Sequence, residues 1–307
     1  LFDETLCEQG RNFNNKIWNA FRLIKGWSTS EEEQPATNAI AVKWFEAKLR
    51  QANQELNDLF SKYRISEALM VVYKLFWDEF SSWYLEMIKP SYGSPIDKKT
   101  FEATLQFFET LLKMLHPFMP FITEELWQHI YTREKGQSIM CEKLTLDAFS
   151  TEDCHLIDEI ENVKLIVTNI RAVRNQKNIS PKVELELHTI SQNRYANYNS
   201  VIKKMANLNN IVEVQEKAAN CALFMIGTDE FAIPVGDMVD HEAELAKQEA
   251  QLKHLEGFLA GIQKKLSNEK FIANAPAAVV ELEQKKAKDS EEKIAALKQS
   301  IAELKQK

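Results

Sequence analysis

Apolar residues along the first half of the chain recur every three or four positions. The clearest run is Leu69, Val72, Phe76, Phe80, Trp83 and Met87. This spacing places all six on one face of an α-helix and predicts that they belong to a core. Similar patterns predict helices over about 3–27, 38–61, 65–88 and 98–115, separated by segments rich in turn-forming or acidic residues. We therefore expect residues 1–150 to form an antiparallel helical bundle.

Two prolines mark the end of this bundle. Pro117 disfavours helix at the residue before it, whereas Pro120 fits the first turn of a new helix. The apolar residues of this segment are expected to close the end of the bundle; they are Phe118, Phe121, Leu126 and Trp127.

The pattern changes in residues 151–238. An amphipathic helix comes first, and "VELELHTI" then alternates apolar and polar residues, as a half-buried strand does. A short helix is predicted near 195–207, followed by a strand at "NIVEVQ" and by two strands in "CALFMIGTDEFAIPVG" that "GTDE" joins as a hairpin. These elements predict a small α/β module.

Heptad spacing dominates residues 239–307. One run comprises Leu245, Leu252, Leu255, Leu259, Ile262 and Leu266, and a second comprises Ile294, Leu297, Ile301 and Leu304. The segment between the runs contains Pro276, which interrupts a helix. Two heptad helices with a break predict an antiparallel coiled-coil hairpin. The predicted fold class is therefore mainly α: a helical bundle, a small α/β module and a coiled-coil hairpin.

Composition and charge narrow the possible functions. The 307 residues have room for two or three domains, and the net charge of −7 argues against a nonspecific nucleic-acid or DNA binder. Residues 240–307 contain twelve lysines and twelve acidic residues, so the acidic excess lies in residues 1–239. A partner that carries phosphates would therefore be held by local basic patches.

Neither the cysteines nor the apolar runs indicate a metal site or a membrane span. The four cysteines are far apart and form no CxxC pair, which is typical of reduced cytoplasmic thiols, and we expect no bound metal. No apolar run approaches the length of a membrane-spanning helix. The chain begins at Leu1, inside a helical pattern, which suggests a piece of a longer protein.

The stretch "RNFNNKIWNAFR", residues 11–22, carries four asparagines within a predicted helix. Each Asn costs roughly 0.5–0.7 kcal/mol of helix propensity relative to Ala. At about 100° per residue, Asn12, Asn15 and Asn19 share one side, away from the apolar side that includes Phe13 and Ile17. An amide can read a base edge or hold a phosphate oxygen. The alternative is a polar face that hydrogen-bonds to a neighbouring helix or to water.

A second group of basic residues lies near the end of the helix that opens the α/β module. Arg171, Arg174 and Lys177 are spaced three residues apart. They either complement the negative end of the helix dipole or contact phosphate.

Two motifs carry a resemblance to a known family. "LHPFMPFITEELW" resembles the end of the helical anticodon-binding domain of class I aminoacyl-tRNA synthetases for valine, isoleucine, leucine and methionine, and "RNFNNKIWNAFR" is similar to the first helix of that domain. The tail "LKHLEGFLAGIQKKLSNEKFIANAPAAVVELEQKK" resembles the C-terminal coiled coil of the valine-specific members. The resemblance covers essentially the whole chain.

The resemblance implies tRNA recognition. Residues 1–150 would grip the anticodon stem and loop of tRNA(Val), residues 151–238 would form a junction, and residues 239–307 would lie along the outer corner of the tRNA. The implied anticodon-facing residues are Asn12, Asn15, Asn19 and Leu23, with Arg11, Lys16 and Arg22 as phosphate partners. Leu23 replaces an aromatic residue that can occupy this position in the family. Backbone contacts are expected from Arg171, Arg174, Lys177, Lys264, Lys265, Lys270, Lys285, Lys286 and Lys288.

The resemblance also implies what lies elsewhere in a parent enzyme. The parent would use ATP and Mg²⁺ to activate valine and attach it to tRNA. The HIGH-like and KMSKS-like signatures of such enzymes do not occur in this sequence, nor does a Gly-rich phosphate loop. We therefore expect no catalytic residue and no cofactor here, in a monomeric cytoplasmic protein. The alternative is a non-catalytic scaffold whose coiled coil binds a protein partner or self-associates.

Overall fold

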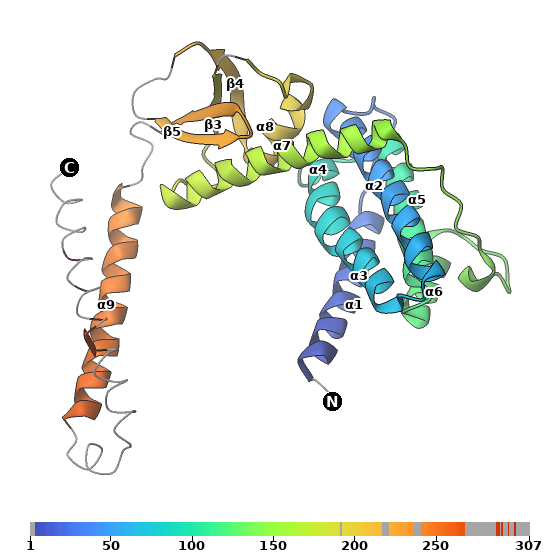
Figure 1. The fold of residues 1–307 in the computed structure, drawn as a ribbon, viewed down its shortest axis with the longest axis horizontal. Helices are drawn as coiled ribbons and strands as arrows, with labels where there is room; N and C mark the ends of the chain where they lie inside the picture. Colours follow the sequence, from blue (N-terminus) through green and yellow to red (C-terminus); the bar gives the residue numbers. More distant parts are fainter. Residues whose placement is uncertain are drawn as a thin grey trace. The chain divides into compact units, whose positions relative to one another are not determined.

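The computed structural model describes residues 4–190, 192–216, 221–235 and 241–267, together with positions 287, 288, 290, 294 and 298 (Figure 1). The chain divides into two compact units. One comprises Leu1–Ile170, Glu184–Lys217 and Leu223–Ala232, and the other comprises Arg171–Val183, Ala218–Ala222 and Ile233–Lys307. The three-part division at residues 150 and 238 remains a prediction. Among the described residues, no helix is long and apolar enough to cross a membrane.

The first half of the chain is the expected helical bundle. Its helices are α1 (Glu4–Lys25), α2 (Ala36–Ser61), α3 (Ile65–Lys74), the π-helix η1 (Leu75–Tyr84), α4 (Leu85–Ile88), α5 (Lys98–Leu115) and α6 (Pro120–Ile130). The predicted boundaries at 65–88 and 98–115 are confirmed. The strands β1 (Thr29–Ser30) and β2 (Ile96–Asp97) form a short parallel pair. Asp97 then caps α5, because its carboxylate accepts a hydrogen bond from the Thr100 amide at 2.8 Å.

The π-helix changes which residues of this segment are buried, relative to the predicted run of six core residues. Phe76 and Phe80 are fully buried, as expected, but Tyr84 is fully buried where Trp83 was predicted, and Trp83 is only partly buried. Hydrogen bonds in a π-helix join residues five apart, so each turn holds more residues than an α-turn. The core face therefore moves one residue along the chain. The Tyr84 hydroxyl is satisfied by Thr104 at 2.8 Å.

The segment 117–130 closes the bundle only in part. Leu126 and Trp127 are fully buried, and Phe118 stacks on Phe60 with ring centroids 5.9 Å apart. Phe121, in contrast, is 90% exposed, so its predicted place in the core is wrong. It lies in the first turn of α6, on the opposite side of the helix from Leu126.

The helix α7 (Thr151–Gln176) begins at a capping box. Ser150 and Asp153 exchange hydrogen bonds between side chain and backbone amide, at 3.0 and 3.1 Å. Asp153 also accepts two hydrogen bonds from the Arg50 guanidinium of α2, at 2.9 and 3.1 Å. Lys164 of α7 lies 2.8 Å from Glu79 of η1. These pairs attach the first half of α7 to the bundle.

The predicted small sheet is present. The strands β3 (Leu185–Ile190), β4 (Leu208–Val214), β5 (Cys221–Ile226) and β6 (Asp229–Pro234) lie in the order β4-β3-β6-β5. β3 pairs in parallel with β4 and antiparallel with β6. The turn η3 (Ala196–Tyr198) and the helix α8 (Asn199–Ala206) connect β3 to β4. The strands and the hairpin predicted for this segment are confirmed.

The helix α9 (His241–Leu266) is the first predicted heptad arm. Ile262 is buried, and four other heptad positions are half-buried; they are Leu252, Leu255, Leu259 and Leu266. Ile294 is buried as well, and Lys298 lies 2.8 Å from Glu256 of α9. Pro276 and the remaining heptad positions of the second arm lie outside the described residues, as does the side chain of Leu245.

Candidate nucleic-acid interface

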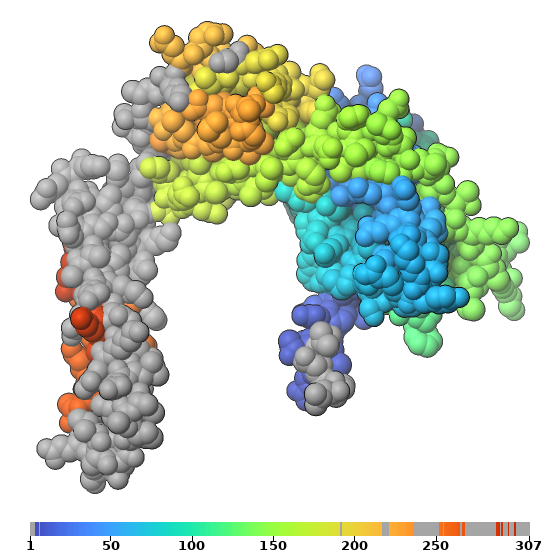
Figure 2. Space-filling model, in the orientation of Figure 1, coloured from blue at the N-terminus to red at the C-terminus, as the bar shows by residue number. Residues whose placement is uncertain are grey.

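Four apolar side chains anchor α1 in the bundle. Phe13, Ile17, Ala20 and Ile24 are all at most 5% exposed. The Phe13 ring packs against η1 and the end of α3, with centroids 4.7 Å from Tyr73 and 5.7 Å from Phe76. This packing fixes the rotation of α1, so the polar residues of the helix face outward. Figure 2 shows the blue N-terminal end of α1 protruding from the bundle.

The three asparagine side chains that share one side of α1, called the amide row below, are exposed. Asn12, Asn15 and Asn19 all face solvent, whereas Asn14 is half-buried and donates to the Gly10 carbonyl oxygen at 3.2 Å. Within the described part of the chain, the side chains of Asn12, Asn15 and Asn19 make no hydrogen bond. The interpretation that these amides are bonded to a neighbouring helix is therefore wrong for this structure. Their donors and acceptors are available to a ligand or to water.

An aromatic pair borders the amide row. Tyr73 and Trp77 stack with centroids 5.6 Å apart and planes inclined by 19°, and the Lys16 ammonium lies 5.0 Å from the Trp77 centroid. Leu23 is half-buried on the same flank of α1. The sequence pattern did not predict this pair. Its only sign in the sequence is two aromatic residues four positions apart, beside the predicted run of core residues. Nothing in that spacing shows that α1 would lie next to them.

The basic residues of α1 project into solvent. Arg22 is exposed, and the Arg11 side chain is 67% exposed and 3.7 Å from an equally exposed Glu8. Such an exposed ion pair contributes at most about 1 kcal/mol. Both guanidinium groups can therefore turn toward a phosphate at little cost.

The three residues of the second basic group differ in their exposure to solvent. Arg171 and Lys177 are exposed, but Arg174 is 5% exposed and its Nη1 donates to the carbonyl oxygens of Ser180 and Val183, at 3.1 and 2.7 Å. Burial lowers the pKa of Arg174. The chain after α7 folds back over this guanidinium, a contact that residue spacing cannot show. In this structure Arg174 therefore holds the loop, and its predicted contact with tRNA stays a prediction.

Only part of the lysine set on the tail can be located. Lys264 and Lys288 are exposed. The side chain of Lys265 and the whole of Lys270, Lys285 and Lys286 lie outside the described residues.

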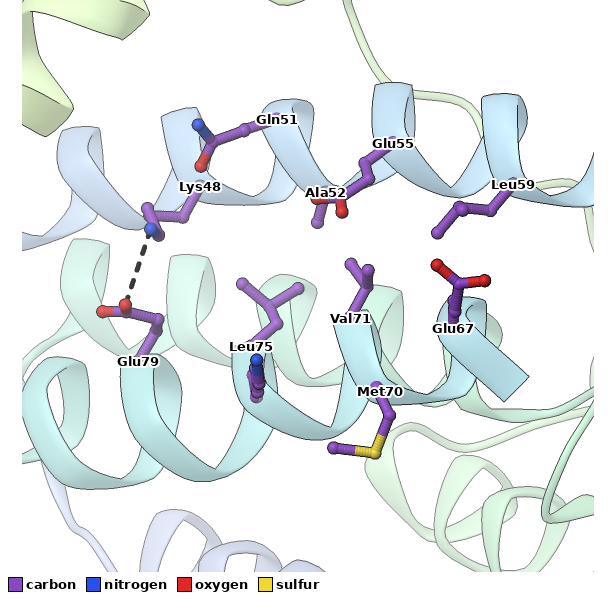
Figure 3. Close-up of a pocket in the computed structure, with 11 residues that line it drawn as sticks. Lys48, Gln51, Ala52, Glu55, Leu59, Glu67, Met70, Val71, Leu75 and Glu79 are labelled. Carbon is purple, nitrogen blue, oxygen red and sulfur yellow. Dashed lines mark ion pairs between the residues drawn. The ribbon is translucent and has the colours of Figure 1, made fainter. Parts of the chain in front are cut away.

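A groove of about 480 Å³ separates α2 from α3 and η1 (Figure 3). Ala52, Leu59, Val71 and Leu75 contribute apolar surface to its lining. At one end Lys48 pairs with Glu79 at 3.5 Å, as the dashed line in Figure 3 marks. The lining holds three glutamates, Glu55, Glu67 and Glu79, against the two lysines Lys48 and Lys74, so the groove presents no net basic surface to a nucleic acid.

Comparisons with known proteins agree with this geometry. The model of a family described as the anticodon-binding domain of tRNA ligase matches residues 42–189. The model of the valyl tRNA synthetase tRNA binding arm matches residues 240–305. The first match begins within α2, so it does not extend to the amide row of α1.

Curated relatives match nearly the whole chain. The valine–tRNA ligases of Phocaeicola vulgatus and Bacteroides thetaiotaomicron are each 58% identical over 99% of the chain, which covers 35% of each relative. The valine–tRNA ligase of Brucella suis is 32% identical over 90% of the chain and 32% of its own length. The chain therefore spans about a third of the length of these relatives. The bundle, the arm and these identities together show that the chain belongs to the valyl-tRNA synthetase family.

Proposed function

We propose that this chain is the tRNA-recognising part of a valine–tRNA ligase, in which α1 reads the anticodon of tRNA(Val). The observation that carries the proposal is the row of three solvent-facing amides, held by a helix whose opposite side is buried. Sequence-specific proteins read RNA mostly on unpaired bases of loops, through the edges of those bases. A well-placed amide contact to a base is worth about 1–3 kcal/mol of discrimination.

The surroundings of the amide row suit an anticodon loop. Lys16, Arg11 and Arg22 supply positive charge for the phosphates of the loop, while the amides supply donors and acceptors for its bases. Trp77 and Tyr73 offer an aromatic surface beside Lys16, on the same helix as Leu23, the position at which an aromatic residue of the family is replaced. Phosphate contacts would position the loop, and the amide contacts would select the sequence.

The coiled-coil arm is proposed to bind the outer corner of the tRNA. The match of residues 240–305 to a tRNA binding arm supports this role. The exposed Lys264 and Lys288 would contact backbone phosphates, and so would Lys265, Lys270, Lys285 and Lys286. Arg171 and Lys177 are proposed as further backbone contacts. These interactions carry no sequence information, so they would act on every tRNA alike.

Catalysis is proposed to lie in another part of the parent enzyme. That part would bind ATP and Mg²⁺ and attach valine to tRNA(Val), in the cytoplasm. Across the residues that the structure describes, there is no group of three or more His, Cys, Asp or Glu side chains that could hold a metal. The chain described here would supply the recognition and positioning of tRNA for that chemistry.

Binding to matched tRNAs tests the proposal. The dissociation constant is measured for tRNA(Val) and for the same tRNA with altered anticodon bases, at the same salt concentration. We expect weaker binding of the altered tRNA, by about 1–3 kcal/mol for each lost base contact. Equal affinity for the two tRNAs would contradict anticodon readout, and absence of binding to either would contradict the proposed function.

The scaffold alternative predicts a different result in solution. Exposed heptads that pair between chains would give a dimer, and this dimer would be lost when residues 239–307 are removed. The ion pair between Lys298 and Glu256 favours pairing within one chain. We therefore expect a monomer by mass measurement at micromolar concentration.

A further inference from the structure

A second row of side chains follows α1 beside the amides. Arg11, Trp18 and Lys25 are seven residues apart, which returns to nearly the same side of a helix with a drift of about 20°. Arg22 lies between this row and Asn15 on the helix surface. Trp18 is 40% exposed, and Arg11, Arg22 and Lys25 are exposed as well. An indole therefore stands in solvent among three cations.

Trp18 lies outside the buried core of the bundle. The four anchoring residues of α1 are buried without it, and its ring contact is with Phe21, at 6.2 Å between centroids. Phe21 in turn lies 6.0 Å from the buried Phe108 of α5. Phe21 thus connects the indole to the core through ring contacts on both sides, while Trp18 itself remains 40% exposed to solvent.

The row ends at an open polar depression of about 530 Å³. Lys25 is held at its rim, because its ammonium donates to the Ile130 carbonyl oxygen at the end of α6, at 3.3 Å. Gln128, His129 and Tyr131 also line the depression. Its walls offer donors, acceptors and a second aromatic ring.

We propose that Trp18 is a stacking platform for an unpaired nucleobase of the bound tRNA, adjacent to the bases read by the amide row. Arg11 and Arg22 hold the phosphates on either side of that base. The depression beside Lys25 receives the continuing strand. This inference rests on the proposed function and adds a contact that neither the motif resemblance nor the family matches assign.

The chemistry favours a nucleobase over an apolar protein surface. Proteins that bind single strands combine positive charge along the backbone with aromatic rings on which bases stack. Trp18 has this composition around it, with cations before and after it on the same helix. A protein-docking patch would instead be a contiguous apolar surface, usually of a few hundred Å² or more.

Abasic substitution tests the stacking directly. Trp18→Ala is compared with Trp18→Phe, which keeps an aromatic face, and with Tyr92→Ala as a control for an exposed aromatic elsewhere on the bundle. The dissociation constant is measured for tRNA(Val) and for a series in which each nucleotide of the anticodon loop is replaced, one at a time, by an abasic one. Thermal unfolding of each variant checks that the fold is kept.

We expect Trp18→Ala to weaken binding roughly 5- to 150-fold, which corresponds to about 1–3 kcal/mol of base–aromatic stacking. Trp18→Phe should recover most of the loss, and Tyr92→Ala should bind like the wild type. One abasic position should weaken the wild-type protein and leave Trp18→Ala unaffected. The salt slope of Trp18→Ala should match the wild type, because no charge is removed.

Two outcomes separate this inference from the proposed function. Suppose that the wild type discriminates between anticodons, but that each abasic substitution weakens binding to the wild type and to Trp18→Ala by the same factor. Stacking on Trp18 is then wrong and anticodon readout stands. If the wild type binds without regard to the anticodon, yet one abasic position weakens it and leaves Trp18→Ala unaffected, anticodon readout is wrong and stacking on Trp18 stands. If the wild type does not bind tRNA, both proposals are wrong.

Discussion

The Lys16 ammonium lies 5.0 Å from the centroid of the Trp77 ring, so a cation of α1 rests on an aromatic residue of the π-helix η1. This contact places the positive charge of Lys16 between the amide row and the Tyr73–Trp77 pair. A cation–π contact at a partly exposed site contributes about 0.5–1 kcal/mol.

A double-mutant cycle can measure this contact. Lys16→Ala and Trp77→Ala are each expected to lower the free energy of unfolding, with a coupling between them of about 0.5–1 kcal/mol in denaturant titrations. Lys16→Ala should also reduce the slope of log affinity for tRNA against log salt by about 0.7–1, because one phosphate partner is removed. Additive effects on unfolding would show that the two side chains act independently.

Asn15→Ala combined with Asn19→Ala should separate recognition from stability. Both residues are exposed within a helix, so Ala is expected to raise the free energy of unfolding by roughly 0.5–0.7 kcal/mol at each position. Discrimination between tRNA(Val) and an anticodon variant should fall. Asn57→Ala is a matched control, since Asn57 is exposed in the helix α2. It should be stabilising without any change in discrimination, and loss of discrimination in this control would point to an indirect effect.

Arg174 and Lys177 should behave oppositely, although they are three residues apart. Arg174→Ala leaves the carbonyl groups of Ser180 and Val183 without their donor, which should lower the free energy of unfolding by about 1–3 kcal/mol. Its salt slope for tRNA binding should not change. Lys177→Ala should leave stability unchanged and reduce the salt slope. A reduced slope for Arg174→Ala in a fully folded sample would argue for a phosphate contact after all.

The Arg50–Asp153 pair predicts a pH dependence. The hydrogen bonds from Arg50 are the largest cause that holds the pKa of Asp153 below its ordinary value. Because the folded-state pKa is depressed, this stabilisation is present above the unfolded-state pKa, about 3.9, and is lost as pH falls through the folded-state value. Asp153→Asn should therefore lower the free energy of unfolding at pH 7, by about 1–3 kcal/mol. Its difference from the wild type should shrink below about pH 4, and a constant difference at all pH values would contradict this account.

Lys264→Ala should weaken all tRNAs by the same factor. Lys264 is exposed near the end of α9, in the segment that matches a tRNA binding arm. The loss should disappear at high salt, and discrimination between anticodons should stay as in the wild type. Lys253→Ala is a control with an exposed lysine about three turns earlier in α9. An effect of Lys264→Ala that depends on the anticodon would place the arm near the anticodon loop instead of the corner.

Several features of this protein follow from the sequence alone. The spacing of apolar residues predicted the helix over 65–88 and its neighbour over 98–115, and Pro120 marked the start of α6. The angular positions of the α1 residues, at about 100° per residue, placed Phe13 and Ile17 on a different side from the amide row. These inferences succeed because the period of a helix and the geometry of proline are local properties, which a few consecutive residues determine.

Tertiary structure decided which of these faces are covered and what lies beside them. The π-helix moved burial from Trp83 to Tyr84, the loop after α7 enclosed Arg174, and η1 placed Trp77 next to Lys16. Phe121 and Trp18 remained exposed although both are large and aromatic. Periodicity shows which side chains share a face, but only the packing of distant segments determines whether that face meets the core, solvent or a ligand.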